Sequence, residues 1–167
     1  MAKGDMSLIG ISGSHRMRVA ASATRGYAGE PLITTGSFTN GVATVNTVVV
    51  ATDGTGVIGT DVVAGLAVTD MIVNTSGTVV ASKLTVGVPV PFVTKWRGKH
   101  KTAGSADTDS EVLGLMWDMA IFDLTSSTYT WDVSTADTGA FQVRDGNPVR
   151  STLDCVIDPR GMRVDIS

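Results

Sequence analysis

The sequence predicts an all-β protein, a compact sandwich or barrel of short antiparallel strands with an extended N-terminal arm. Hydrophobic residues make up 43 % of the chain but aromatic residues only 5 %, so small and branched side chains carry most of the apolar content. Branching at Cβ restricts χ1 and suits a pleated sheet better than a helix. Short apolar runs also alternate with clusters of turn-forming residues, which is typical of sandwiches and barrels.

The arm is residues 1–29, which are rich in Gly, Ala and Ser and have no sustained period of either a strand or a helix. The only acidic residue among several basic ones is Asp5. We expect an extended basic segment that is held by a partner surface, with Arg16, Arg18 and Arg25 among the contacts.

Residues 30–93 form the first half of the predicted β domain. Asn40-Gly41 favours a tight hairpin turn, and residues 53–56 turn the chain again. Pro89 and Pro91 cannot donate ladder hydrogen bonds, so this end of the last strand lies at an edge or leaves the sheet. The expected strands are 31–35, 42–51, 62–73 and 78–93.

Residues 94–110 are polar and densely charged, which predicts a loop between two halves, and residues 111–167 form the second half. The Leu, Met and Trp content of segment 111–124 would suit a helix, but Gly114 and the alternation around residues 116–119 favour a strand. The expected strands of this half are 111–124, 129–133, 140–144, 152–157 and 162–166.

The run Lys95-Trp96-Arg97-Gly98-Lys99-His100-Lys101 gathers four formal positive charges around a tryptophan. Three interpretations remain open: a loop that docks on an acidic partner, a solvated loop whose Trp packs on the domain, and a surface that stacks nucleic acid bases. The net charge of −3 argues against nucleic acid. We favour docking, with Lys95, Trp96, Arg97, Lys99 and Lys101 as contact residues.

Two motifs could carry a ligand. Residues 54–59 read Gly-Thr-Gly-Val-Ile-Gly, but a dinucleotide loop must open a helix and the following residues are strand-like, so we expect a hairpin loop. Asp107, Asp109 and Glu111 alternate like calcium ligands. Val112 stands where that loop requires glycine, and a solvated acidic turn is the better interpretation.

The sequence gives no support to catalysis, and we expect neither enzyme activity, nor a cofactor, nor a metal. It contains two histidines, one cysteine and no Gly-x-Ser-x-Gly elbow. Cys155 lies in an apolar strand pattern and is expected to be a buried, inert thiol. No apolar stretch reaches the length of a membrane span and no leader is recognised, so we expect no membrane contact and assembly in a host cytoplasm.

The first half resembles the lambda-type head decoration proteins of tailed phages. The resemblance covers Pro31-Leu32, residues 49–55 (VVATDGT) and residues 63–68 (VAGLAV), about a quarter of the chain, and residues 94–167 have no counterpart in the short lambda-type protein. It implies a virion protein on the capsid exterior that contacts the major capsid protein and itself as a homotrimer, and cements the lattice.

A charge-poor chain fits that expectation, because only 17 % of residues are charged against roughly 25 % in a typical soluble domain. Alternatives are a tail, fibre or other surface β module, and a lectin-like domain that stacks sugars on Trp96, Trp117 or Trp131.

Overall fold

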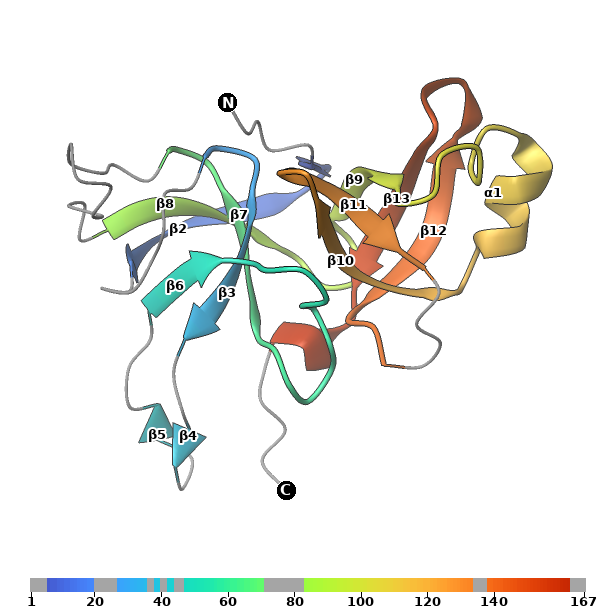
Figure 1. The fold of residues 1–167 in the computed structure, drawn as a ribbon. Helices are drawn as coiled ribbons and strands as arrows, with labels where there is room; N and C mark the ends of the chain where they lie inside the picture. Colours follow the sequence, from blue (N-terminus) through green and yellow to red (C-terminus); the bar gives the residue numbers. More distant parts are fainter. Residues whose placement is uncertain are drawn as a thin grey trace.

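Two five-stranded barrels lie side by side and form the molecule (Figure 1). The computed structural model describes residues 6–19, 27–35, 38–39, 42–43, 47–70, 83–133 and 138–162. The predicted all-β class is confirmed. The strands are mostly antiparallel, and parallel pairing occurs between β2 and β6 and between β9 and β11.

The first barrel closes in the order β2-β6-β3-β7-β8. The central strand β7 is buried along its whole length, as its continuous apolar sequence requires. Gly65 lies at φ +145°, and a Cβ there would stand 2.1 Å from the carbonyl oxygen of Gly87, so the contact between β7 and β8 requires glycine. The strands are β2 (Ser12–Val19), β3 (Pro31–Thr35), β6 (Thr47–Val50), β7 (Val63–Ala67) and β8 (Lys83–Pro89), with a ribbon of β4 (Phe38–Thr39) and β5 (Val42–Ala43) projecting from them.

The second barrel closes in the order β9-β11-β10-β12-β13, and β1 adds to β9. Its interior is filled by Trp96, Phe122, Trp131 and Phe141, whose ring centroids are 4.8–5.8 Å apart. The elements are β1 (Ser7–Ile9), β9 (Lys95–His100), α1 (Asp109–Leu115), β10 (Met119–Thr125), β11 (Thr128–Asp132), β12 (Phe141–Asn147), η1 (Pro148–Arg150), β13 (Thr152–Ile157) and η2 (Pro159–Met162).

The glycine-rich segment 54–59 joins the two barrels. Phe122 of β10 donates its N–H to the carbonyl of Thr55 at 2.9 Å, and Ala140 donates to Gly56 at 2.7 Å. Gly56 has a φ of +91° and lies against the rings of Phe122 and Phe141. The Asp61 carboxylate accepts the N–H of Gly56 at 2.9 Å. The motif is therefore a structural connector, and it does not open a helix.

A shared core also connects the barrels. Tyr129 of β11 is buried, and its hydroxyl donates to the carbonyl of Ala51, which follows β6. Val63 and Leu66 of β7 belong to the same buried cluster as Trp96. The two barrels thus bury one continuous apolar region between them, which holds their surfaces in a fixed relation.

The expected N-terminal arm is wrong for residues 7–9, which form β1 and pair with β9, and for residues 12–19. Residues 12–19 form β2, which pairs with β8 from Ser12 opposite Pro89 to Arg18 opposite Lys83. The strand has few apolar residues, and its hydrogen bonds to a distant strand hold it in the barrel. The predicted loop 94–110 is likewise wrong at its start, because β9 begins at Lys95.

The predicted strand 111–124 is wrong in its first part, where α1 forms. The Thr108 side chain accepts the N–H of Glu111 at 3.3 Å, and the Glu111 carboxylate accepts the N–H groups of Thr108 and Asp107 at 2.9 Å. This is a capping box, and it satisfies backbone donors that a helix start leaves free. The predicted strand 162–166 is wrong at Met162, which is the last residue of the 3-10 helix η2. Residues 163–166 lie outside the described residues.

Candidate interaction surface

An apolar turn projects where the chain passes from the first barrel to the second. The Thr94 side chain accepts the N–H of Val90 at 2.7 Å and donates to the carbonyl of Ile11, and Thr94 N–H donates to the carbonyl of Val90 at 2.9 Å. Phe92 donates its N–H to Ile157 at the end of β13. The backbone of the turn is therefore hydrogen-bonded to the residue before β2 and to the end of β13, and so to both barrels.

The side chains on this turn are apolar and exposed. Ile11 is 70 % exposed, Phe92 51 % and Val93 52 %. Phe92 also has a φ of +58°, a conformation that bulky side chains rarely adopt. We call Ile11, Val90, Phe92 and Val93 the apolar turn. Large apolar side chains on a rigid support are typical of protein-protein contact sites.

Strand β2 continues from the apolar turn and carries two exposed arginines, Arg16 and Arg18. In the antiparallel register they lie opposite Thr85 and Lys83 of β8, so both are on the outer face of the barrel. Neither makes an ion pair with a described residue. Their charges are available to an acidic partner. Arg25 lies outside the described residues.

A shallow groove of about 400 Å³ adjoins these residues on the outer face of β7, β8 and β2. Gly87 lies between Leu8 and Val68, and a Cβ at that position would stand 3.0 Å from the Leu8 side chain. Ser12 and Ser14 line its β2 side. The groove adds concave, largely apolar surface along the first residues of β2, which follow Ile11 in the chain.

The basic run 95–101 has a different role from the one predicted. It forms β9, and Trp96 is 0 % exposed inside the second barrel, so the prediction that Trp96 contacts a partner is wrong. Successive side chains of a strand face opposite sides, and Trp96 therefore faces inward while Lys95 and Arg97 face outward. A period of two was visible in this run, but its charge density favoured a loop.

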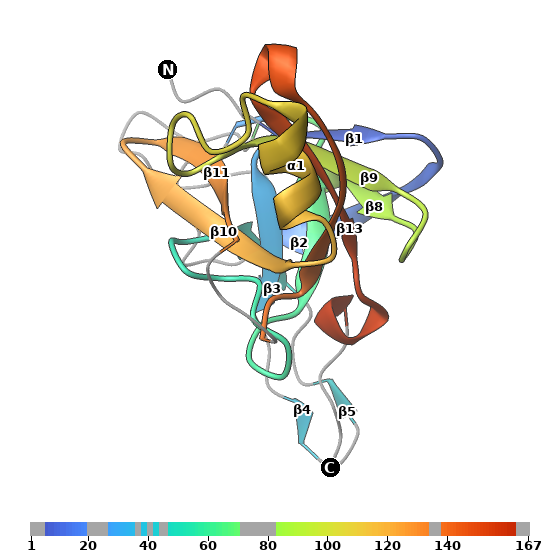
Figure 2. The same cartoon turned by 90° about the vertical axis from the view of Figure 1, so that its right-hand side faces the viewer.

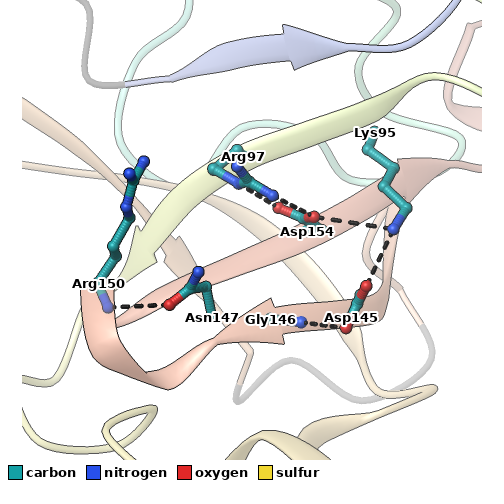
Figure 3. Close-up of polar contacts among 7 residues, drawn as sticks. All are labelled: Lys95, Arg97, Asp145, Gly146, Asn147, Arg150 and Asp154. Atoms are coloured by element: carbon teal, nitrogen blue, oxygen red, sulfur yellow. Dashed lines mark hydrogen bonds and ion pairs between the residues drawn. The ribbon is translucent and has the colours of Figure 1, made fainter.

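Lys95 and Arg97 are neutralised within the chain (Figure 3). Arg97 donates two hydrogen bonds to Asp154, at 2.7 and 2.8 Å, and these bonds raise the pKa of the guanidinium. Lys95 lies 3.0 Å from Asp145 and 3.8 Å from Asp154. The pairs with Asp154 link β9 to β13, and the pair with Asp145 links β9 to β12, so little charge is left for a partner.

Lys101 is also paired, because its ammonium group donates to the Asp132 carboxylate, which raises the pKa of Lys101. Lys99 is exposed and has no ion pair with a described residue. Of the predicted contacts within 95–101, Lys99 keeps a free charge. Lys99 lies on β9 of the second barrel, whereas Arg16 and Arg18 lie on β2 of the first barrel.

The tryptophans do not form a common stacking platform. Trp96 and Trp131 are both 0 % exposed, whereas Trp117 is 59 % exposed.

Cys155 is fully buried, and burial raises the pKa of its thiol well above the ordinary value, as expected for an inert cysteine.

Comparisons of the chain with protein-family models, curated proteins and solved structures find no match. Within the described residues, no three metal-ligating side chains gather as a metal site would require. No helix of the described chain has the length and apolarity to cross a membrane.

Proposed function

We propose that this protein is a decoration, or cement, protein that binds the outside of a tailed-phage capsid lattice and stabilises it. The observation that carries the proposal is the exposed apolar turn, from which β2 continues with Arg16 and Arg18, two exposed arginines that make no ion pair with a described residue. An apolar centre with arginines beside it is the composition of a protein-protein contact site. The partner surface should therefore be apolar with acidic residues around it.

Binding to folded capsid subunits stabilises the shell by mass action, because the protein does not bind subunits that have unfolded. A filled barrel interior supports this role, since a clamp must keep its contact residues fixed while the lattice is strained. The resemblance to lambda-type decoration proteins implies that three copies sit together at local threefold positions. Sedimentation equilibrium of the free protein tests that homotrimer.

The proposal is tested with capsid shells of the phage that encodes the chain. Purified protein is mixed with shells lacking it, the shells are pelleted, and the bound copies are counted. Phe92→Asn/Val93→Ser removes the apolar side chains, and asparagine tolerates the left-handed conformation at residue 92. Arg16→Glu/Arg18→Glu reverses the charges on β2. Both variants should lose most of their occupancy.

The matched control is Arg150→Glu, which changes the net charge by the same amount as Arg16→Glu alone. Arg150 is an exposed cation of the second barrel that makes no ion pair with a described residue. Arg150→Glu should occupy shells like the parent chain, whereas Arg16→Glu should lower the occupancy. The proposal fails if the parent does not bind shells, if it labels tails only, or if reversal at Arg16 and Arg18 leaves occupancy unchanged. Melting curves of each free variant show that its fold is intact.

A further inference from the structure

Trp117 holds an unusual position between α1 and β10. It is more than half exposed and has a φ of +78°, although a left-handed conformation is unfavourable for a bulky side chain. Its N–H donates to the carbonyl of Val143 at 2.9 Å, and its own carbonyl accepts from the Gln142 side chain at 3.1 Å. Two contacts to β12 therefore hold an exposed indole in a strained conformation. Strain of this kind concentrates at functional sites.

Arg144, also on β12, stacks on this indole. Its guanidinium carbon lies 4.1 Å from the ring centroid. The Nε atom is buried without a hydrogen-bond partner, and the side chain makes no ion pair with a described residue. Stacking fixes the plane of the guanidinium. Because Nε is buried, the two terminal nitrogens are the ones that can bind a planar anion. Among the described residues, none supplies an acceptor for this guanidinium.

A carboxylate is the acceptor that fits, because guanidinium and carboxylate form two parallel hydrogen bonds. The exposed indole offers apolar area beside that contact. Leu113, in the last turn of α1, is also exposed, and its carbonyl accepts the N–H of Met116, the residue before Trp117. Helix α1 lies on the outside of the second barrel (Figure 2). The exposed leucine favours a protein segment over a sugar as the ligand. A peptide with alternating apolar and acidic residues can contact the apolar side chains and the guanidinium at the same time.

We infer that Trp117 and Arg144 form a second recognition site, which binds an acidic, partly apolar segment of a partner protein. The site lies on the second barrel, away from the apolar turn. It does not depend on the proposed capsid contact, and its test uses the free chain alone.

The test measures binding of a fluorescent peptide of alternating leucine and glutamate by anisotropy. The same peptide with glutamine in place of glutamate, and an oligogalacturonate, are compared with it. Trp96 and Trp131 are buried, so acrylamide quenching of the intrinsic fluorescence reports mainly on Trp117. The glutamate peptide should bind and protect Trp117 from quenching. Arg144→Gln and Trp117→Ala should each weaken binding about tenfold or more, the range of a lost charge-assisted contact.

Arg144→Lys keeps the charge but loses the planar fork, and it should bind with intermediate affinity. Arg150→Gln is the matched control, an exposed arginine of η1 outside the site, and it should bind like the parent. The inference is overturned if the glutamate peptide does not bind, or if the glutamine peptide binds equally well. Binding of the oligogalacturonate alone, or full affinity in Arg144→Gln, would also overturn it.

Discussion

Asp154 and Arg97 form the charge pair on which the structure makes its sharpest stability prediction. Asp154 is only 2 % exposed, and Arg97 supplies two short hydrogen bonds to its carboxylate. In Arg97→Leu the buried carboxylate keeps, among the described residues, only Lys95, whose ammonium nitrogen is 3.8 Å away. Removing one partner of a buried pair costs about 3–5 kcal/mol. The lower part of this range applies, about 3–4 kcal/mol, because a third of the Arg97 side chain reaches solvent.

For a chain of this size, that loss lowers the melting temperature by roughly 6–16 °C. Lys95→Leu is the control on the same strand and face. It mainly removes the pair with Asp145, which is more than half exposed, and should cost less than about 1 kcal/mol. Arg97→Leu/Asp154→Leu replaces the pair by apolar groups and should recover to within about 1 kcal/mol of the parent.

Thermal and urea unfolding, followed by circular dichroism, measure all four proteins. The reasoning is refuted if Arg97→Leu and Lys95→Leu differ by less than about 0.5 kcal/mol, the usual effect of a surface substitution. It is also refuted if the double variant is no more stable than Arg97→Leu. Either result would mean that solvent, and not Arg97, satisfies the carboxylate.

Four further predictions follow from single positions. Gly56→Ala forces a side chain into the left-handed region and should cost about 1–2 kcal/mol in urea unfolding, so parental stability would contradict the connector role of this segment. Tyr129→Phe leaves the Ala51 carbonyl buried without its donor and should cost about 1–3 kcal/mol, whereas no change would mean that the hydroxyl does not tie the barrels. Hydrogen bonding by the Gly146 N–H, and then by Lys95, lowers the pKa of Asp145, so its contribution to stability is complete above the unfolded pKa of about 3.9 and is lost as the pH falls through the folded pKa. Asp145→Asn should therefore be less stable than the parent above that pH, and its stability should fall less steeply as the pH is lowered. An unchanged fall of stability at acid pH would refute this. Finally, the free energy of unfolding of Trp117→Gly should be about 1 kcal/mol higher than that of Trp117→Ala, because glycine relieves the left-handed strain. The reverse order would show that no strain is stored there.

Local sequence predicted the strands whose own residues form the core. Residues 63–67 (VAGLA) are a continuous apolar run and residues 152–157 (TLDCVI) are mostly apolar, and they form β7 and β13 in the described structure. The closure of each barrel was not predictable in the same way, because it depends on pairing between distant segments. Strand β2 shows this most clearly. Its sequence, SGSHRMRV, has too few apolar residues to indicate a strand, and β8 and β6 supply its hydrogen bonds.

Two other differences had usable signals in the sequence. Thr108 and Glu111 have the spacing of a capping box, which outweighs the strand-like alternation that follows it. In the run 95–101, the period of two placed Trp96 and Gly98 on the inner face, although the charges suggested a loop. The partners of those charges, Asp145 and Asp154, lie 50 or more residues away, and no local pattern indicates them.

The two candidate sites share one physical feature: each has an exposed aromatic residue with a positive φ. Among the described residues, five other than glycine have positive φ values. Ser126 and Ser127 form the tight turn between β10 and β11, and Ser151 ends η1, where short polar residues are tolerated. Phe92 and Trp117 are bulky aromatic residues, for which a left-handed backbone is unfavourable. In both cases the fold accepts strain and places a large apolar ring in water. The interaction that compensates for this cost is expected outside the chain, on a partner surface.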